Sequence, residues 1–147
     1  MLRTPSTGFS LVEMLVAIAI VGFVMAVAVP SSIQLYDGMQ RRQAVRTTME
    51  FLNSARERAL ATGTYQDVMV KPSSNQIWNS RKRATLSAAV RLQVHGAAEL
   101  NFDQTGVIRF YPDGSSSGGG VDLARADGSG TRVTVDWLIG RVEQASL

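Results

Sequence analysis

Apolar residues form one continuous stretch near the start of the chain, from Phe9 to Val29, and a single acidic residue, Glu13, interrupts it. The stretch has about the length of the roughly 20 residues that a helix needs to cross a bilayer. An ionisable residue within such a span costs at least ~2.5 kcal/mol at mid-membrane, so we expect Glu13 to have a partner. The pattern predicts a transmembrane helix over residues 9–30.

Beyond Pro30 the pattern becomes that of an amphipathic helix, which we expect from about Ser31 to Thr62. Gly63 is a suitable stop for it. Pro30 and Gly22 favour local kinking or melting upstream, because proline removes one backbone hydrogen bond and glycine lowers helix propensity. The apolar face of the helix has residues at three- and four-residue spacing: Val45, Met49, Leu52, Ala55 or Arg56, and Ala59.

After Thr64 the apolar period shortens to that of strands. The turn residues Pro72–Asn75 separate the first two strands, and Asp127–Gly130 is expected to connect the last two. The expected strands are Tyr65–Lys71, Ile77–Ser80, Val90–Val94, Glu99–Phe102, Val107–Tyr111, Val121–Arg125 and Arg132–Leu138. The sequence therefore predicts an α+β protein, in which a long N-terminal helix packs on an antiparallel β-sheet and residues 31–147 form one α+β domain.

Composition and charge limit the classes of function. The formal net charge is +3, too small for bulk charge to indicate a nucleic-acid protein, and the absence of cysteine excludes disulfides and thiolate metal sites. The basic clusters Arg41-Arg42 with Arg46, and Arg81–Arg83, are interpreted as solvated faces, with a phosphate or lipid-headgroup contact as the less favoured alternative. Arg3 precedes the apolar span and favours a cytoplasmic N-terminus, which makes the residues after Pro30 periplasmic.

No motif in the chain indicates catalysis, a cofactor or a metal. The glycine-rich segment Gly114–Gly120 is followed by neither the lysine nor the helix of a phosphate-binding loop, so we interpret it as a flexible turn between two strands. His95, the one histidine, is expected in a polar surface loop. No Gly-x-Ser-x-Gly motif is present. Three acidic residues, Asp113, Asp122 and Asp127, lack the alternation of a calcium loop.

The N-terminal residues carry a family resemblance. The leader over residues 1–8, the Gly8-Phe9 junction, Glu13 and Pro30 resemble those of type IV prepilins and type II secretion pseudopilins. The resemblance implies cleavage after Gly8 by prepilin peptidase and methylation of Phe9. It also implies that Glu13 pairs with the amino terminus of a neighbouring subunit during assembly. The alternatives are a secretory signal cleaved after Ala28 and an uncleaved signal anchor. The apolar stretch is too long for the 7–15-residue core of a secretory signal, and neither alternative explains Glu13.

The C-terminal half resembles the GspH/FimT group of minor pseudopilins, through residues 107–119 and 133–142. The resemblance rests on the Phe110-x-Pro112-Asp113-Gly114 segment and on a last strand that closes with Gly140-Arg141-Val142. The resemblance implies a pilin-like fold and a structural role in the periplasmic pseudopilus tip of type II secretion. Its implied partners are other pseudopilins, the prepilin peptidase and the bacterial inner membrane, from which the subunit is extracted into a filament.

A second function remains open at this stage, that of a FimT/FimU-like minor pilin of a type IV pilus that contacts DNA during uptake. Arg132 and Arg141 are its candidate DNA contacts. Glu143 argues against it because a carboxylate repels phosphate. A major pilin is a weaker alternative, since many carry a C-terminal cysteine pair that this chain lacks.

Overall fold

The structure is a computed structural model that describes residues 9–96, 100–102 and 104–147, with backbone alone for residues 27–34. The chain forms two compact units, residues 1–38 and 39–147. Its helix α1 spans Leu11–Thr62 and is followed by the 3-10 helix η1 (Pro72–Ser74) and eight strands. The strands are β1 (Gln66–Lys71), β2 (Gln76–Trp78), β3 (Arg83–Thr85), β4 (Arg91–His95), β5 (Gly106–Phe110), β6 (Gly119–Ala124), β7 (Gly130–Val135) and β8 (Val142–Ser146).

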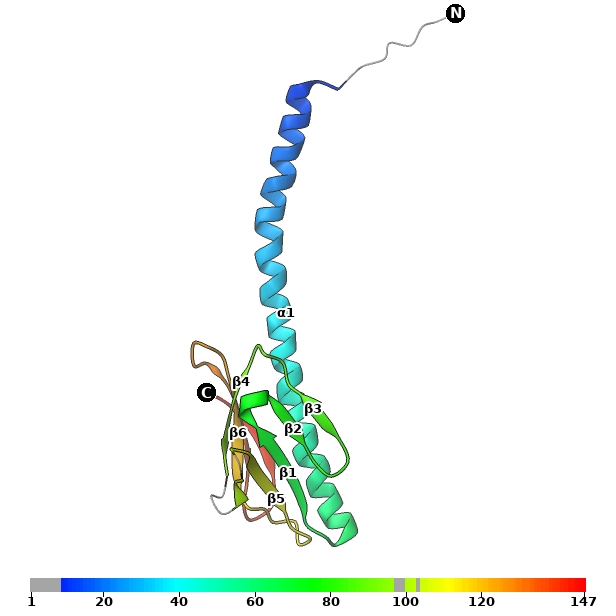
Figure 1. Cartoon of the computed structure of the whole chain (residues 1–147), viewed down its shortest axis with the longest axis vertical. Helices are drawn as coiled ribbons and strands as arrows, with labels where there is room; N and C mark the ends of the chain where they lie inside the picture. Colours follow the sequence, from blue (N-terminus) through cyan, green and yellow to red (C-terminus); the bar gives the residue numbers. More distant parts are fainter. Residues whose placement is uncertain (1–8, 97–99, 103) are drawn as a thin grey trace, which may run out of the picture. The chain divides into compact units, whose positions relative to one another are not determined.

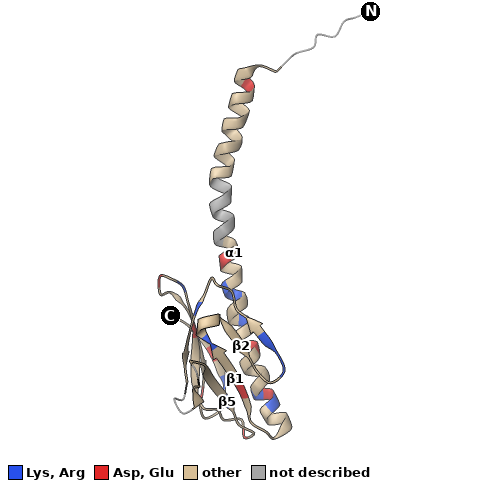
Figure 2. Cartoon of the chain, in the orientation of Figure 1, with Lys and Arg blue, Asp and Glu red and all other residues tan. Residues whose placement is uncertain are grey.

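The first unit contains the N-terminal part of α1, in which residues 11–26 are mainly apolar. Its side chains from Leu11 to Ala26 are all exposed, and Glu13 is the one charged residue among them; Figure 2 shows that Lys, Arg, Asp and Glu lie mostly in the second unit. No helix within the described residues combines the length and the apolar character required to span a membrane. The backbone stays helical through Gly22 and Pro30, so the expected local melting is wrong. A single missing backbone bond does not end so long a helix.

The core of the second unit lies between the C-terminal part of α1 and the strands (Figure 1). Leu52 and Ala59 of the helix have no exposed surface, and Val45 and Met49 pack at the margin of the core. This confirms the helix face predicted from the apolar spacing. Gly63 ends the helix with a φ of 66°, in the left-handed region that glycine favours.

The strands form two four-stranded sheets, with the order β3-β2-β1-β5 in one and β4-β6-β7-β8 in the other. All the strand pairs are antiparallel. Buried residues alternate along β5 and β7, as expected when one face of a sheet covers the core. The largest fully buried side chains of the strands are Phe110, Ile77, Ile108, Val68, Val70, Val121 and Val133.

Several strand predictions need correction. Strands β3 and β8 were not predicted, because their short polar sequences lack an apolar run. Strand β7 ends at Val135 rather than Leu138, since residues 136–140 form a turn. The Asp127–Gly130 connection consequently joins β6 and β7 and not the last two strands. Glu99 lies outside the described residues, and Phe102 forms only an isolated bridge with Thr105.

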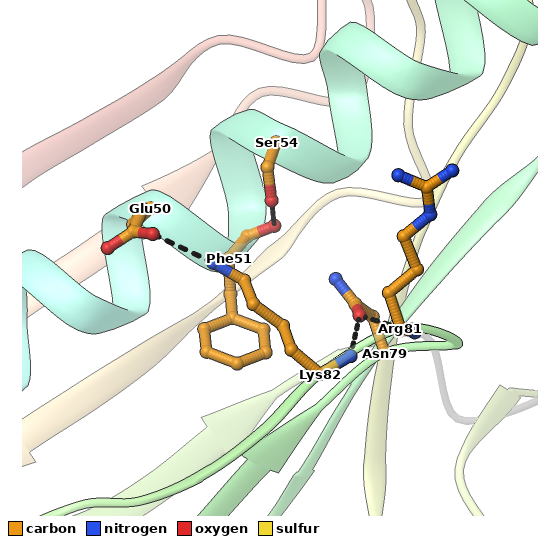
Figure 3. A network of polar contacts seen from close by, with 6 residues as sticks. All are labelled: Glu50, Phe51, Ser54, Asn79, Arg81 and Lys82. Carbon is orange, nitrogen blue, oxygen red and sulfur yellow. Dashed lines mark hydrogen bonds and ion pairs between the residues drawn. The ribbon is translucent and has the colours of Figure 1, made fainter.

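The connection between β2 and β3 is fastened to α1 by a polar network (Figure 3). Lys82 Nζ donates to Glu50 Oε1 at 2.8 Å and lies 4.5 Å from the centre of the Phe51 ring. Asn79 Oδ1 accepts the backbone N–H groups of Arg81 and Lys82, which fixes the turn. The ion pair lowers the pKa of Glu50 below its ordinary value. At least one cation of the Arg81–Arg83 cluster, Lys82, therefore contacts α1 within this unit.

Candidate functional site

The N-terminal segment places the predicted assembly residue in the first turn of α1. Gly8, the predicted cleavage position, lies outside the described residues, and Phe9 is the first residue that the structure describes. Ser10 C=O accepts the Met14 N–H at 3.2 Å, which closes the first helical turn around Glu13. A carboxylate at a helix N-terminus is favoured by the helix dipole. Glu13 is exposed and has no ion-pair partner among the residues described.

The outer face of the second sheet carries a charged cluster across three strands. Asp122 of β6 receives two hydrogen bonds from Arg132 of β7, at 2.7 Å from Nε and 2.8 Å from Nη2. Its Oδ2 also lies 2.9 Å from His95 Nε2 of β4. The pairing follows from the register, which sets Asp122 opposite Arg132. His95 is thus part of a strand with a carboxylate partner, which corrects the expectation of a polar loop.

The charges of this cluster stabilise one another. The hydrogen bonds from Arg132, and secondarily from His95, hold the pKa of Asp122 below its ordinary value, although burial opposes the shift. The same carboxylate raises the pKa of Arg132. A bidentate guanidinium–carboxylate pair fixes both side chains in one plane. The cluster joins the three strands, and a side chain so committed is poorly placed to act as an acid or base.

The two predicted DNA-contact residues occupy the same sheet face but stand apart. Arg141 precedes β8, and its Nη1 lies 3.3 Å from Glu143 Oε1. Arg132 is opposite Ala145 in the β7–β8 register, so four strand positions, about 13 Å at the usual rise, separate the two arginines along the sheet. A carboxylate accompanies each of them. The structure therefore gives each predicted DNA contact an internal acidic partner.

A tightly fastened turn presents apolar side chains between β7 and β8. Asp136 Oδ1 accepts the N–H groups of Leu138 and Ile139, and Arg56 Nε of α1 donates to Ile139 C=O at 3.1 Å. Gly140 closes the turn with a φ of 59°, where a Cβ would lie 2.4 Å from Gly114 O. Even so, Trp137 is 67% exposed and Leu138 is 62% exposed. This turn holds large apolar groups in solvent.

The glycine-rich segment between β5 and β6 is a turn, as predicted, but hydrogen bonds fasten it. Ser117 N–H donates to Arg109 C=O, and Ser116 N–H donates to Trp137 C=O. Gly119 has a φ of 108°, and a Cβ there would lie 2.2 Å from His95 O. The glycines in this segment allow a left-handed backbone and close packing between strands. The sequence alone did not distinguish this role from flexibility.

The three acidic residues Asp113, Asp122 and Asp127 each have hydrogen-bond partners within the domain. Asp113 and Asp127 each accept hydrogen bonds from the backbone and hydroxyl of the serine two residues later, which lower the pKa of both carboxyls. Asp122 is held by Arg132. Across the described ranges, no group of three or more potential metal ligands occurs.

Comparisons with known proteins define the class first. Residues 3–29 match the prokaryotic N-terminal methylation motif. The fold resembles the structure of the minor pseudopilin EpsH from the type 2 secretion system of Vibrio cholerae, with a TM-score of 0.57 and 13% identity over 73% of this chain and 97% of that one. The helix and antiparallel sheets are therefore those of a pilin-like α+β protein, as the sequence predicted.

Two further matches define the family within that class. Residues 44–138 match the family described as type II transport protein GspH. A type II secretion system protein H from Xanthomonas campestris pv. campestris is 33% identical over 148 aligned residues, which cover 99% of this chain and 86% of the relative. The chain belongs to the GspH family, and it is a GspH-like minor pseudopilin of type II secretion.

Sequence reasoning missed two features of the molecular surface, strand β8 and the apolar turn before it. Asp136 and Gly140 bracket the turn, and an Asx residue followed by a glycine is a turn signal. That signal was available, but the apolar run Trp137–Ile139 resembled the end of a strand. No strand was predicted for residues 143–146.

Proposed function

We propose that this minor pseudopilin enters the periplasmic pseudopilus tip as a processed, membrane-anchored subunit. Prepilin peptidase cleaves after Gly8 and methylates Phe9. Residues 9–30 anchor the subunit in the inner membrane, and residues 31–147 form its periplasmic domain. The observation that carries the proposal is the N-terminal methylation motif over residues 3–29, on the same chain as a GspH domain.

The surface of the first unit supports the anchoring step. Residues 11–26 of its helix expose large apolar side chains, among them Leu15 at 59% and Phe23 at 74%, and Phe9 before the helix is 77% exposed. A helix that is apolar on every side requires lipid or neighbouring helices to cover it. In the proposed function, membrane lipid covers the helix before assembly, and the helices of other pseudopilins cover it afterwards.

The position of Glu13 supports the assembly step. A carboxylate surrounded by hydrocarbon is tolerable when a cation from an adjacent helix neutralises it. Cleavage at Gly8–Phe9 creates such a cation on every processed subunit, at the end of the helix where Glu13 lies. Pairing between the amino terminus of one subunit and Glu13 of the next fixes their axial register. Glu13 then determines where subunits join more than how strongly they hold.

The experiment is the replacement of Glu13 by alanine in the full chain, co-expressed with the other pseudopilins of its own secretion system. Glu13→Ala should leave membrane insertion intact or improve it, because a costly charge is removed. Recovery of the partner pseudopilins with the tagged subunit should fall. Affinity purification from detergent-solubilised membranes measures both quantities.

Ser10→Ala is the matched control, because it changes a polar residue in the same segment without altering charge. It should behave as the wild type in insertion and in partner recovery. Undiminished recovery of partners with Glu13→Ala would contradict the pairing role.

A further inference from the structure

We propose that the free edge of strand β8 is a docking site for an extended segment of a second pseudopilin, which adds a strand to the sheet β4-β6-β7-β8. The inference deepens the proposed function and rests on it, because it names the surface through which this subunit meets a neighbour. It follows from the hydrogen-bond pattern of the last two strands, from the state of the other sheet edges and from the apolar turn before β8.

The hydrogen-bond pattern shows which groups of β8 point outward. In an antiparallel pair, hydrogen-bonded and non-hydrogen-bonded residue pairs alternate. Asp136 N–H donates to Arg141 C=O at 2.9 Å, and Leu147 N–H donates to Gly130 C=O at 3.0 Å. With the observed register, this alternation directs the backbone groups of Glu143 and Ala145 toward β7.

The intervening residues of β8 therefore direct their N–H and C=O groups away from the sheet. These residues are Val142, Gln144 and Ser146. No hydrogen bond to their outward groups occurs among the described residues. Gln144 and Ser146 are exposed, and Val142 is partly buried. Donors and acceptors at two-residue spacing match the backbone of another extended strand, the chemistry of β-strand addition.

Two of the other sheet edges, those of β5 and β3, are protected in ways that β8 is not. The edge of β5 is covered, because Arg109 N–H donates to Ser117 Oγ and Ser117 N–H donates back to Arg109 C=O. Strand β3 has only three residues and begins with Arg83, two features that discourage pairing. Before the remaining edge strand, β4, Val90 C=O accepts a hydrogen bond from Asn75 Nδ2 at 3.1 Å.

Strand β8 carries neither proline nor lysine. Its one charged residue, Glu143, has its backbone directed toward β7 and its side chain beside Arg141. Strand β8 thus lacks the proline and lysine that natural proteins often place on an edge, and its one carboxylate is paired with Arg141. The unpaired edge of this five-residue strand is therefore open to pairing with a strand of another subunit.

The turn before β8 supplies apolar area next to this edge. Trp137, Leu138 and Ile139 stand exposed immediately before the strand, on a backbone fastened by Asp136 and Arg56. Edge hydrogen bonds give register but little net affinity, because water satisfies the same groups in the free protein. A segment that runs along β8 and past its start would bury these side chains, and large aromatic anchors of this kind provide most of the affinity at interfaces.

Proline at position 144 tests the backbone pairing directly. Gln144→Pro removes only an outward N–H, and proline is tolerated on an edge strand when its nitrogen faces solvent. We expect at least a tenfold loss of co-expressed pseudopilins recovered with the full-length tagged subunit from solubilised membranes. The thermal transition of the subunit should stay close to that of the wild type.

Two variants control for side chain and fold. Gln144→Ala alters the side chain but keeps the N–H, and it should recover partners as the wild type does. Ala145→Pro removes an N–H directed toward β7 and should lower the thermal transition, which verifies the assignment of inward and outward groups. Wild-type recovery with Gln144→Pro would overturn the edge inference alone. Absence of partners from the wild-type purification would overturn the proposed function and the inference with it.

Amide hydrogen exchange provides a second readout on the unmodified protein. In the subunit alone, the amides of Glu143 and Ala145 should be protected, and those of Val142, Gln144 and Ser146 should exchange rapidly. In the purified complex with co-expressed pseudopilins, we expect at least a tenfold slowing at the outward positions. Outward amides that exchange equally fast in the complex would overturn the inference even if Gln144→Pro failed to fold.

Discussion

Replacement of Leu52 by alanine tests whether the helix face and the sheets form one core. Leu52 lies on α1 with no exposed surface, so Leu52→Ala removes buried methyl groups and leaves a cavity. Such substitutions cost roughly 2–5 kcal/mol. Near 60 °C the unfolding entropy of a domain of this size corresponds to about 4 °C of melting temperature per kcal/mol, and we expect a decrease of about 8–20 °C. Thermal unfolding of residues 31–147, followed by circular dichroism, measures it.

Leu60→Ala is the matched control, because the same change is made on the same helix at a side chain that is 47% exposed. It should lower the free energy of unfolding by less than about 1 kcal/mol, since less apolar area leaves water on folding. Equal effects of the two substitutions would refute the reasoning that Leu52 faces the core. The comparison also requires that residues 31–147 fold as a soluble monomer, and failure of the unaltered fragment to show a cooperative transition would contradict that expectation.

Two further predictions concern the charged cluster and the DNA hypothesis. Because the pKa of Asp122 is lowered in the folded state, its contribution to stability is present above the unfolded pKa near ~3.9 and is lost as pH falls through the lower folded pKa. Asp122→Asn should cost roughly 1–2 kcal/mol at neutral pH, and the difference from wild type in thermal scans should shrink below about pH 4; a constant difference would contradict the assignment. Residues 31–147 should bind double-stranded DNA weakly at near-physiological salt, with little change on Arg132→Ala or Arg141→Ala, because each arginine has an acidic partner. Tight binding in a gel-shift titration, abolished by Arg141→Ala, would instead support the pilus alternative.

The apolar periodicity was sufficient to predict the helix, its buried face and most of the strands. Leu52 and Ala59 lie where their spacing placed them, and Val107–Tyr111 closely matches β5. The Gly8-Phe9 junction and Glu13 identified the class of protein, because this short motif is specific to pilin-like proteins. These features depend on local sequence or on one helical face, and both can be deduced from a single chain.

Tertiary pairing accounts for what could not be predicted. Strand β8 is polar, and its strand conformation comes from register with β7 rather than from its own apolar pattern. The role of His95 likewise depends on Asp122, which is distant in sequence and becomes its neighbour only when β4 pairs with β6. The glycines near Gly119 signalled a turn, but only the structure shows that His95 O leaves no room for a Cβ there.

The measurement that tests the account most directly is mass spectrometry of the amino terminus of the subunit, purified from cells that contain its own secretion system. We predict a mature chain that begins at Phe9 with a methylated amino group, because the methylation motif covers the junction after Gly8. That product would also supply the amino-terminal cation that pairs with Glu13 of a neighbouring subunit in the proposed assembly step. A chain that retains Met1, or that begins after Ala28, would contradict the account.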